Sequence, residues 1–576
     1  MQYAVVAMMT SRSLFAVVPV LVLLGAPVAQ KQQSRTQPQL PTLRATTRLV
    51  LVDVIVTDDE NRPVADLQAS DFVVLEDGKP QKIATFARLP EQDKPPAPPP
   101  SPLPADLYTN DPRYRAVTGT PIIMLLDLLN TPSADRPRIR LAMIDFIRKH
   151  LRPGQATAVF LLGRKLELLQ NFTDDPRILL AAVDRITGNP RESVADHTTS
   201  DMIQRAIDRA KPDQLAQLEH ILEIAQRFES AYQIAAATDH AATLLQAVTA
   251  IARAAWSIPG RKSMIWVSAG LPVQVKRGDV AAYYPTSQEV VSFTDLLARI
   301  ADSLNEAQIA IYPVDIRGLN TTAPLWGDTS LRTDRYSRAR SRNDSPVTSE
   351  QTAELESYQD SLARIAAQTG GRVFLNRNDA DVAIALAAKD GEHYYTIGYY
   401  AEDRRWNGGF RKIELKVARK GLHLRHRTGY FAEDSATSRA RAEWDLANAL
   451  RYDPLTTARV VFSARATLAV PGQVDVEFML PPASIHFEQQ NGLYVGSMDF
   501  HVAALTNDDK VATSAAKTSN FSLDPQKYSQ VMSFSSLTDS VPLALSPGKY
   551  RVRLLIRDNL TGNLGTVEIP ITVPKK

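Results

Sequence analysis

The fold depends on the stretch IIMLLDLLNTP, Ile122–Pro132. Five apolar residues run without interruption into Asp127, and a polar pair, Asn130 and Thr131, follows two residues later. A continuous apolar run of this length is typical of a strand that is buried on both faces of a parallel sheet. The stretch therefore predicts a central strand over Ile122–Leu126 and places Asp127 at its carboxyl end.

Strands and helices alternate on the carboxyl side of this strand. A helix is predicted from Arg136, because apolar residues recur at the spacing of one helical face up to Ile147. A long helical segment, residues 201–256, is broken near Pro212, and the strand Ile309–Val314 ends in Asp315. Further strands are predicted over Ala156–Leu162, Leu166–Phe172, Ser263–Val267 and Arg372–Leu375. This order predicts an α/β fold with an open, mainly parallel sheet between helices.

The flanking segments have the alternating pattern of β structure instead. Residues 46–90 contain three short strand-like runs separated by turns, which predicts a small β module, and residues 91–107 form a proline-rich linker. Residues 115–434 are assigned to the α/β domain, with the polar segment 320–349 as a flexible insertion. Seven or so short strands with turns between them predict a β-sandwich over residues 455–576.

Composition limits the possible partners and cofactors. The chain has 576 residues, a formal net charge of +3 and no cysteine. The small net charge argues against nucleic acid as the main partner, and the lack of cysteine excludes disulfides and thiolate metal sites. An apolar run, Leu14–Leu24, follows Arg12 and precedes a plausible cleavage site at Ala29, so residues 1–29 are predicted to be a signal peptide.

Export is therefore predicted, to the periplasm or the extracellular space. The alternative is that the same apolar run stays uncleaved and anchors the chain, although it is short for a membrane span of about 20 residues. No later segment resembles a transmembrane helix, so no membrane span is expected after removal of the signal peptide.

Three motifs together resemble a known family. They are DFVVLEDGKPQKIATF at residues 71–86, IPGRKSMIWVSAGLP at residues 258–272 and the terminal RTGY at residues 427–430. In combination they resemble the von Willebrand factor type A-related proteins found mainly in acidobacteria, over residues 46–434. The resemblance implies a six-stranded, mostly parallel sheet between helices. The function of that family is largely undefined.

Ordinary type A domains hold Mg²⁺ or Mn²⁺ with an Asp-x-Ser-x-Ser motif at the end of the first strand. The corresponding offsets here are Asp127, Leu129 and Thr131, so one hydroxyl is missing. The central strand of ordinary domains ends in Ser-Asp-Gly, whereas Ser268 is followed here by Ala269. The separate loop threonine has no secure counterpart, and the candidates are Thr238, Thr243 and, more weakly, Thr173.

The resemblance thus implies a degenerate cation site, with Asp127 and Thr131 as ligands for Mg²⁺ or Mn²⁺. One carboxylate and a few neutral oxygens form a weak cage, because Mg²⁺ gives up its water ligands reluctantly. The alternative is that Asp127 caps the next helix or accepts hydrogen bonds from loop amides. Ligands of α/β sheets bind at the carboxyl ends of the strands, so the predicted ligand-binding residues are Asp127, Asn130, Thr131 and Ser268.

Enzyme motifs are incomplete. A serine hydrolase elbow, G-x-S-x-G, would have Trp266 at its first glycine. A phosphate loop is not formed around Gly260, so Arg261 and Lys262 are expected on the surface or paired with acids. The resulting prediction is an exported, non-enzymatic, adhesion-type protein that binds a protein or an envelope component. The alternatives are a structural envelope component without ligand chemistry and an extracytoplasmic hydrolase that uses Ser268.

Overall fold

The structure is a computed structural model. It describes residues 49–89, 101–114, 120–186, 199–256, 258–269, 274–276, 290–292, 294–318, 358–402, 406–432, 457–470, 472–508 and 510–574. Residues 47–576 form one compact unit, distinct from residues 1–46. The predicted signal peptide, the insertion at 320–349 and most of the predicted linker lie outside the described residues.

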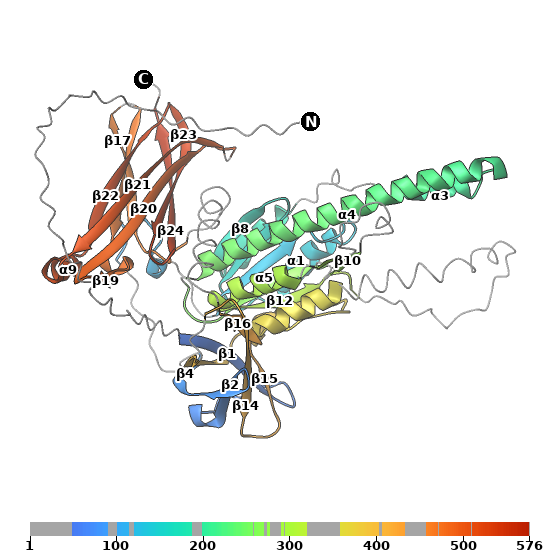
Figure 1. Ribbon diagram of the computed structural model, residues 1–576, viewed down its shortest axis with the longest axis horizontal. Helices are drawn as coiled ribbons and strands as arrows, with labels where there is room; N and C mark the ends of the chain where they lie inside the picture. Colours follow the sequence, from blue (N-terminus) through green and yellow to red (C-terminus); the bar gives the residue numbers. More distant parts are fainter. Residues whose placement is uncertain are drawn as a thin grey trace, which may run out of the picture. The chain divides into compact units, whose positions relative to one another are not determined.

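A five-stranded sheet forms the α/β domain, in the order β12-β9-β6-β7-β8. Its two edge strands, β8 and β12, are labelled in Figure 1. The first four strands are parallel, and β8 pairs antiparallel to β7 at one edge. Every residue of β6, β9 and β12 is buried, as expected for strands covered on both faces. The bounds are β6 Ile122–Asp127, β7 Thr157–Leu162, β8 Leu166–Thr173, β9 Lys262–Ser268 and β12 Ile309–Asp315.

Helices cover both faces of this sheet. The strand residues alternate in direction, so Ile123 and Leu125 pack against one set of helices while Ile122 and Met124 pack against the other. The first set comprises α4 (Pro212–Ala255), α5 (Thr294–Glu306) and the helix at residues 358–369. The second set comprises α1 (Arg136–Lys149), α2 (Pro176–Asp184) and α7 (Ala380–Asp390).

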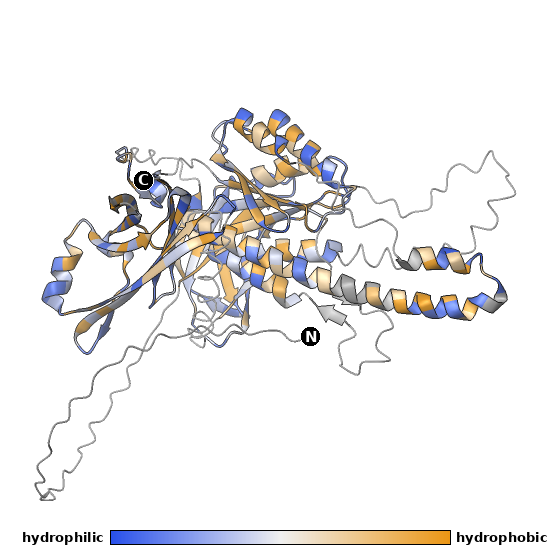
Figure 2. Cartoon of the chain, turned by 90° about the horizontal axis from the view of Figure 1, so that it is seen from above, coloured by the Kyte–Doolittle hydropathy of each residue, from blue (hydrophilic) through white to orange (hydrophobic). Residues whose placement is uncertain are grey.

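Helix α4 is 44 residues long, and α3 (Thr199–Ile207) packs beside it (Figure 1). The predicted break near Pro212 is confirmed, because α3 ends before this residue and α4 begins at it. Apolar residues recur along α4 (Figure 2). Two of its large apolar residues, Ile221 and Phe228, are exposed. Among the described residues, no helix combines the length and the apolar character that a membrane span requires.

The segment Arg372–Leu375 differs from its prediction. It contributes one parallel bridge, between Phe374 and Val314, rather than a full strand, so the described sheet has five strands and not the six that the resemblance implies. A short hairpin, β10 (Gln274–Lys276) with β11 (Val290–Ser292), lies between β9 and α5 in the sequence.

The N-terminal β module is not a separate unit, which corrects the predicted boundaries at 46–90 and 115–434. Strand β13, from the end of the predicted α/β domain, pairs between β1 and β4, and β14 pairs with β2. The two resulting sheets, β15-β1-β13-β4 and β16-β14-β2-β3, share one core. Their bounds are β1 Leu49–Asp58, β2 Phe72–Glu76, β3 Lys79–Gln81, β4 Ile83–Leu89, β13 Tyr394–Tyr400, β14 Phe410–Val417, β15 Leu422–Arg425 and β16 Gly429–Phe431. We call this two-sheet unit the β domain.

The C-terminal part consists of two antiparallel sheets around a single apolar core. One sheet has the order β22-β18-β17-β5, and the other is β19-β20-β23-β24 with β21 also paired to β20. Strand β5 precedes the α/β domain in sequence and was not predicted. The bounds are β5 Tyr108–Thr109, β17 Ser463–Val470, β18 Gln473–Leu480, β19 Glu488–Gln490, β20 Leu493–Leu505, β21 Val511–Leu523, α9 Pro525–Met532, β22 Leu537–Ala544, β23 Gly548–Asp558 and β24 Leu564–Val573.

Candidate functional site

Three neighbouring parallel strands end in polar residues. Asp127 ends β6, Ser268 ends β9 and Asp315 ends β12, and Asp315 lies opposite Ser268 in the strand register. All three side chains are buried. Because the strands are parallel and adjacent, these residues meet at the carboxyl end of the sheet, where ligands of α/β folds bind.

The Asp127 carboxylate is fully buried and accepts four hydrogen bonds. The backbone N–H of Asn130 donates to Oδ1 at 2.9 Å. Three side-chain donors reach Oδ2: Asn130 Nδ2 at 2.9 Å, Trp266 Nε1 at 3.0 Å and Ser268 Oγ at 2.9 Å. Asp127 therefore joins its own loop to the adjacent strand β9, as the loop-amide alternative from the sequence describes.

The electrostatic state of Asp127 reflects two opposed effects. Burial raises the pKa of the Asp127 carboxyl, whereas the hydrogen bonds from Asn130, Ser268 and Trp266 lower it, and burial dominates. Four convergent donors are the partners that a carboxylate needs when it is removed from water. Asp127 thus acts as the acceptor around which the end of the sheet is organised.

Thr131 completes this cluster. Its side chain is buried, and its Oγ1 accepts the backbone N–H of Ala269 at 3.3 Å. The structure therefore brings together all four residues predicted to bind a ligand. Thr173 ends β8 at the opposite edge, beside the start of β7, and Thr238 and Thr243 belong to α4 rather than to the loops around Asp127.

These residues do not fit a divalent cation. Mg²⁺ requires an octahedron of oxygen lone pairs, whereas both Asp127 oxygens face N–H or O–H donors and the Thr131 hydroxyl faces an amide. Within the described ranges, no group of three or more His, Asp or Glu side chains could hold a metal. Cation binding at Asp127 and Thr131 stays a prediction that this donor set does not support.

Asp315 forms a second polar anchor at the same end of the sheet. It accepts the Arg317 backbone N–H at 3.0 Å, Nε at 2.9 Å and Nη2 at 2.8 Å. The Arg317 guanidinium also lies 5.4 Å from the centre of the Tyr358 ring. The sequence located Asp315 at a strand end but assigned it no role. Like β6, β12 is a buried strand that ends in aspartate. This repeated pattern is the signal in the sequence that could have identified Asp315 as part of this polar end of the sheet.

Arginine side chains surround this end of the sheet. Arg138 donates from Nη1 to the Arg317 carbonyl oxygen at 2.6 Å, and its side chain is 56% exposed. Arg136 donates from Nε to the Thr131 carbonyl oxygen at 3.2 Å. Arg138 also pairs with Asp135 at 3.5 Å, and Arg317 pairs with Asp315 at 2.8 Å, so neighbouring carboxylates balance these two guanidinium charges.

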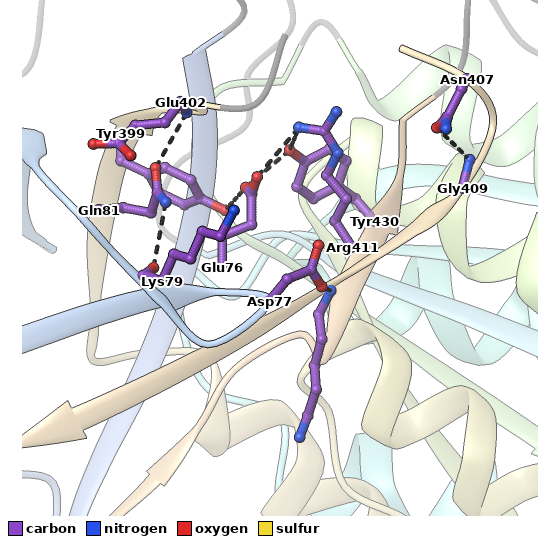
Figure 3. Close-up of polar contacts among 11 residues, drawn as sticks. Glu76, Asp77, Lys79, Gln81, Tyr399, Glu402, Asn407, Gly409, Arg411 and Tyr430 are labelled. Carbon is purple, nitrogen blue, oxygen red and sulfur yellow. Dashed lines mark hydrogen bonds and ion pairs between the residues drawn. The ribbon is translucent and has the colours of Figure 1, made fainter. Parts of the chain in front are cut away.

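A second polar cluster, which the sequence analysis missed, lies in the core of the β domain (Figure 3). Glu76 accepts hydrogen bonds from Tyr399 Oη at 2.7 Å, Tyr430 Oη at 3.0 Å and Arg411 Nη1 at 3.2 Å. Burial, followed by the nearby Glu76 carboxylate, raises the pKa of both tyrosine hydroxyls. Two of the quoted motifs contribute to this cluster, Glu76 from residues 71–86 and Tyr430 from RTGY, which indicates a structural role for them.

Arg261 and Lys262 are buried, which corrects their predicted surface position. Lys262 donates from Nζ to the Ile258 carbonyl oxygen at 2.6 Å, and burial lowers the pKa of its amino group to about 7. Arg261 donates from Nη2 to the Gly370 carbonyl oxygen at 2.8 Å. Both residues lie at the amino end of the parallel sheet, where β9 begins, and they are therefore not part of the carboxyl-end cluster.

Comparisons with known proteins show remote matches. No protein-family model and no curated protein matches the chain. Two matching solved structures are an aerotolerance-related membrane protein from Bacteroides fragilis and the conserved hypothetical protein BatB from Bacteroides thetaiotaomicron. Each is 12% identical, covers 47% of this chain and 98% of its own, and has a TM-score of 0.22.

A third match is a von Willebrand factor type A protein from Catenulispora acidiphila. It is 10% identical, covers 64% of this chain and 81% of its own, and has a TM-score of 0.23. At these identities and TM-scores, the matches assign neither a family nor a function to the chain.

Proposed function

We propose that the chain is an exported, non-enzymatic binding protein. In this proposal the α/β domain is von Willebrand A-like, and the carboxyl end of its parallel sheet contacts a protein or another component of the cell envelope without a bound metal. The observation that carries the proposal is the buried cluster of Asp127, Asn130, Thr131 and Ser268, which holds two adjacent strand ends in one arrangement.

A preformed surface favours binding because little conformational entropy is lost when the partner docks. The loops that follow β6 and β9 are connected through Asp127 and Thr131, and the turn after β12 is held by the Asp315–Arg317 pair. The surface residues above these anchors, such as Arg138, are thus carried by an ordered base.

The hydrolase alternative requires Ser268 to act as a nucleophile. In the structure its side chain is fully buried, and its hydroxyl donates to the Asp127 carboxylate at 2.9 Å. A nucleophile must contact both its base and the substrate. This geometry therefore supports a structural role for Ser268 and makes the binding proposal the stronger one.

Site-specific photocross-linking tests this proposal. A photoreactive amino acid replaces Arg138, and the purified protein is irradiated with an envelope fraction from the organism that produces it. The matched control replaces Arg177, which is exposed at the start of α2, at the opposite edge of the same sheet. We expect a discrete adduct from position 138, none from position 177, and unchanged yield with a metal chelator present.

Two outcomes contradict the proposal. Equal adducts from both positions would show that the carboxyl end is not a specific surface. A lack of adducts from either position, with both variants folded, would favour a structural envelope component without ligand chemistry.

A further inference from the structure

A small polar cavity lies where β1, the beginning of β9 and the segment before β16 meet. Its volume is about 20 Å³. Its wall combines apolar surface with charged and amide residues, which are Asp53, Arg261, Asn305, Gln308 and Arg427. A cavity of this size holds a single water-sized particle. None of these residues belongs to the carboxyl-end cluster, so the cavity is a separate feature of the molecule.

Two guanidinium groups line this cavity, and within the described residues each has one N–H group without a hydrogen-bond acceptor. Arg261 Nε and Arg427 Nε are both buried, and neither has a hydrogen-bond acceptor within the described part of the chain. One other nitrogen of each head group is anchored, because Arg261 Nη2 donates to Gly370 O and Arg427 Nη2 donates to Leu51 O, each at 2.8 Å. Buried polar groups without a partner are rare in proteins and indicate a bound water or ion.

The charges around the cavity favour an anion over a neutral particle. The carboxylate that lines the cavity is Asp53, whose Oδ1 accepts Thr396 Oγ1 at 2.6 Å. Other acids within electrostatic reach are already engaged: Asp390 forms an ion pair with Arg425, and Asp302 accepts the Phe431 backbone N–H. Two arginines therefore face one carboxylate inside the cavity.

Lys262 adds to this imbalance when it is protonated. It follows Arg261 directly, is buried, and has Asp53 as its opposite charge. Asp53 is then the carboxylate shared by three cations, and a buried cation whose charge is not fully balanced costs several kcal/mol because it has lost its hydration. A negative particle in the cavity would accept both free N–H groups and supply the missing charge, whereas a water molecule would supply only the acceptor.

We propose that this cavity is a binding site for a single monatomic anion, with chloride as the physiological ligand. Phosphate, sulfate and organic carboxylates are too large for a space of one water-sized sphere. The anion would bridge Arg261 of the α/β domain and Arg427 of the β domain, beside Asp53 of β1. It would thereby stabilise the contact between the two domains.

Anion-dependent melting of the full-length protein tests this proposal. Sodium chloride is replaced stepwise by sodium gluconate at constant ionic strength, so that general screening stays the same. A ligand that binds only the folded state raises the melting temperature in a saturable way. We expect this rise with chloride and with bromide but not with sulfate. Identical melting curves in chloride and gluconate would overturn the proposal and leave a water in the cavity.

Two variants and one crystallographic observation test whether the chloride-dependent melting shift arises at this cavity. Arg427→Gln keeps a polar side chain but removes the cation, and we expect the chloride-dependent shift to disappear. Arg419→Gln, an exposed arginine of the β domain, should keep the full shift. If Arg427→Gln does not fold, crystals of the unaltered protein soaked in bromide decide the question. An anomalous peak between Arg261 and Arg427 is expected, and a peak only elsewhere would overturn the proposal.

Discussion

Asp127 shows how one carboxylate can organise the end of a sheet through hydrogen bonds. Its two oxygens accept an amide of its own loop and three side-chain donors, two of which come from the neighbouring strand β9. A strand-end aspartate with a nearby threonine has the same residue pattern in a cation site and in a donor-filled cluster. The sequence could therefore predict the location of the cluster but not its chemistry, because Trp266 is 139 residues away.

Replacement of Asp127 tests this role. Asp127→Ala leaves the donors on Asn130, Trp266 and Ser268 without their acceptor, and each buried orphan costs about 1–3 kcal/mol. We expect a loss of at least about 3 kcal/mol in the free energy of unfolding, measured by denaturant titration in metal-free buffer. Asp145→Ala, on the exposed face of α1, is the control and should cost less than about 1 kcal/mol. Equal stability of the two variants would contradict the account.

The buried amino group of Lys262 should make the free energy of unfolding depend on pH. Its folded-state pKa of about 7 lies below the ordinary lysine value of 10.5. Between these values the unfolded chain binds a proton that the folded chain has released, so stability rises with pH across this window. The slope from this residue is at most about 1.4 kcal/mol per pH unit, and it vanishes below pH 7.

The variant Lys262→Met isolates this contribution, because methionine fills a similar volume without charge. We expect its free energy of unfolding to rise less steeply than that of the unaltered protein between pH 7 and 10. Lys149→Met, on the exposed surface of α1, should keep the original slope. If the pH dependence of stability is unchanged in Lys262→Met, the Lys262 amino group is hydrated and its pKa is not lowered by burial.

The β domain shows which relations between elements a sequence pattern can and cannot reveal. Alternating apolar residues predicted three strand-like runs and the turns between them within residues 46–90, and β1, β2 and β4 are present there. Their partners, β13 and β14, lie more than 300 residues later. Alternation identifies which face of a strand is buried, but it contains no information about which strand will pair with it.

Glu76 connects these distant elements and can be tested directly. Glu76→Ala removes the shared acceptor of Tyr399, Tyr430 and Arg411, leaving a buried guanidinium without its partner. Loss of one member of a buried ion pair costs about 3–5 kcal/mol. We expect a destabilisation of this size, with loss of amide protection in β2 and β14 measured by hydrogen exchange.

Glu414→Ala provides the matched control for Glu76. It removes a partly exposed glutamate of the same strand pair, one that contacts Lys412 at the surface. We expect a change of less than about 1 kcal/mol. If both substitutions change the free energy of unfolding by the same amount, the Glu76 cluster does not hold β2 and β14 together.

The whole molecule is assembled from chain segments that cross between domains. The segment before the α/β domain pairs with the C-terminal sheets, where Asn110 is fully buried. Its Nδ2 donates to the carbonyl oxygens of Thr457 and Val460, and its Oδ1 accepts the Phe462 N–H. The sequence patterns predicted a mainly parallel α/β sheet and flanking β strands, but the exchange of segments follows from contacts that no local pattern encodes.

Asn110 therefore predicts a long-range effect on stability. Asn110→Ala removes the side-chain partners of the Val460 carbonyl oxygen and the Phe462 amide, while the Thr457 carbonyl oxygen keeps the Thr566 N–H. We expect a loss of about 2–4 kcal/mol confined to the C-terminal sheets. Tryptic cleavage under native conditions should then appear within residues 457–574. Asn520→Ala, an exposed position on β21, is the control and should leave the cleavage pattern unchanged.

The most direct test of the metal-independent site is a melting curve of the metal-stripped protein with and without millimolar Mg²⁺, Mn²⁺ or Ca²⁺. The same curves are measured for Asp127→Asn, which keeps the shape of the side chain. A cation bound only by the folded state must raise the melting temperature. The donor-filled carboxylate predicts no cation-specific shift in either protein. A saturable rise in the unaltered protein that is lost in Asp127→Asn would contradict it and place a cation at the end of β6.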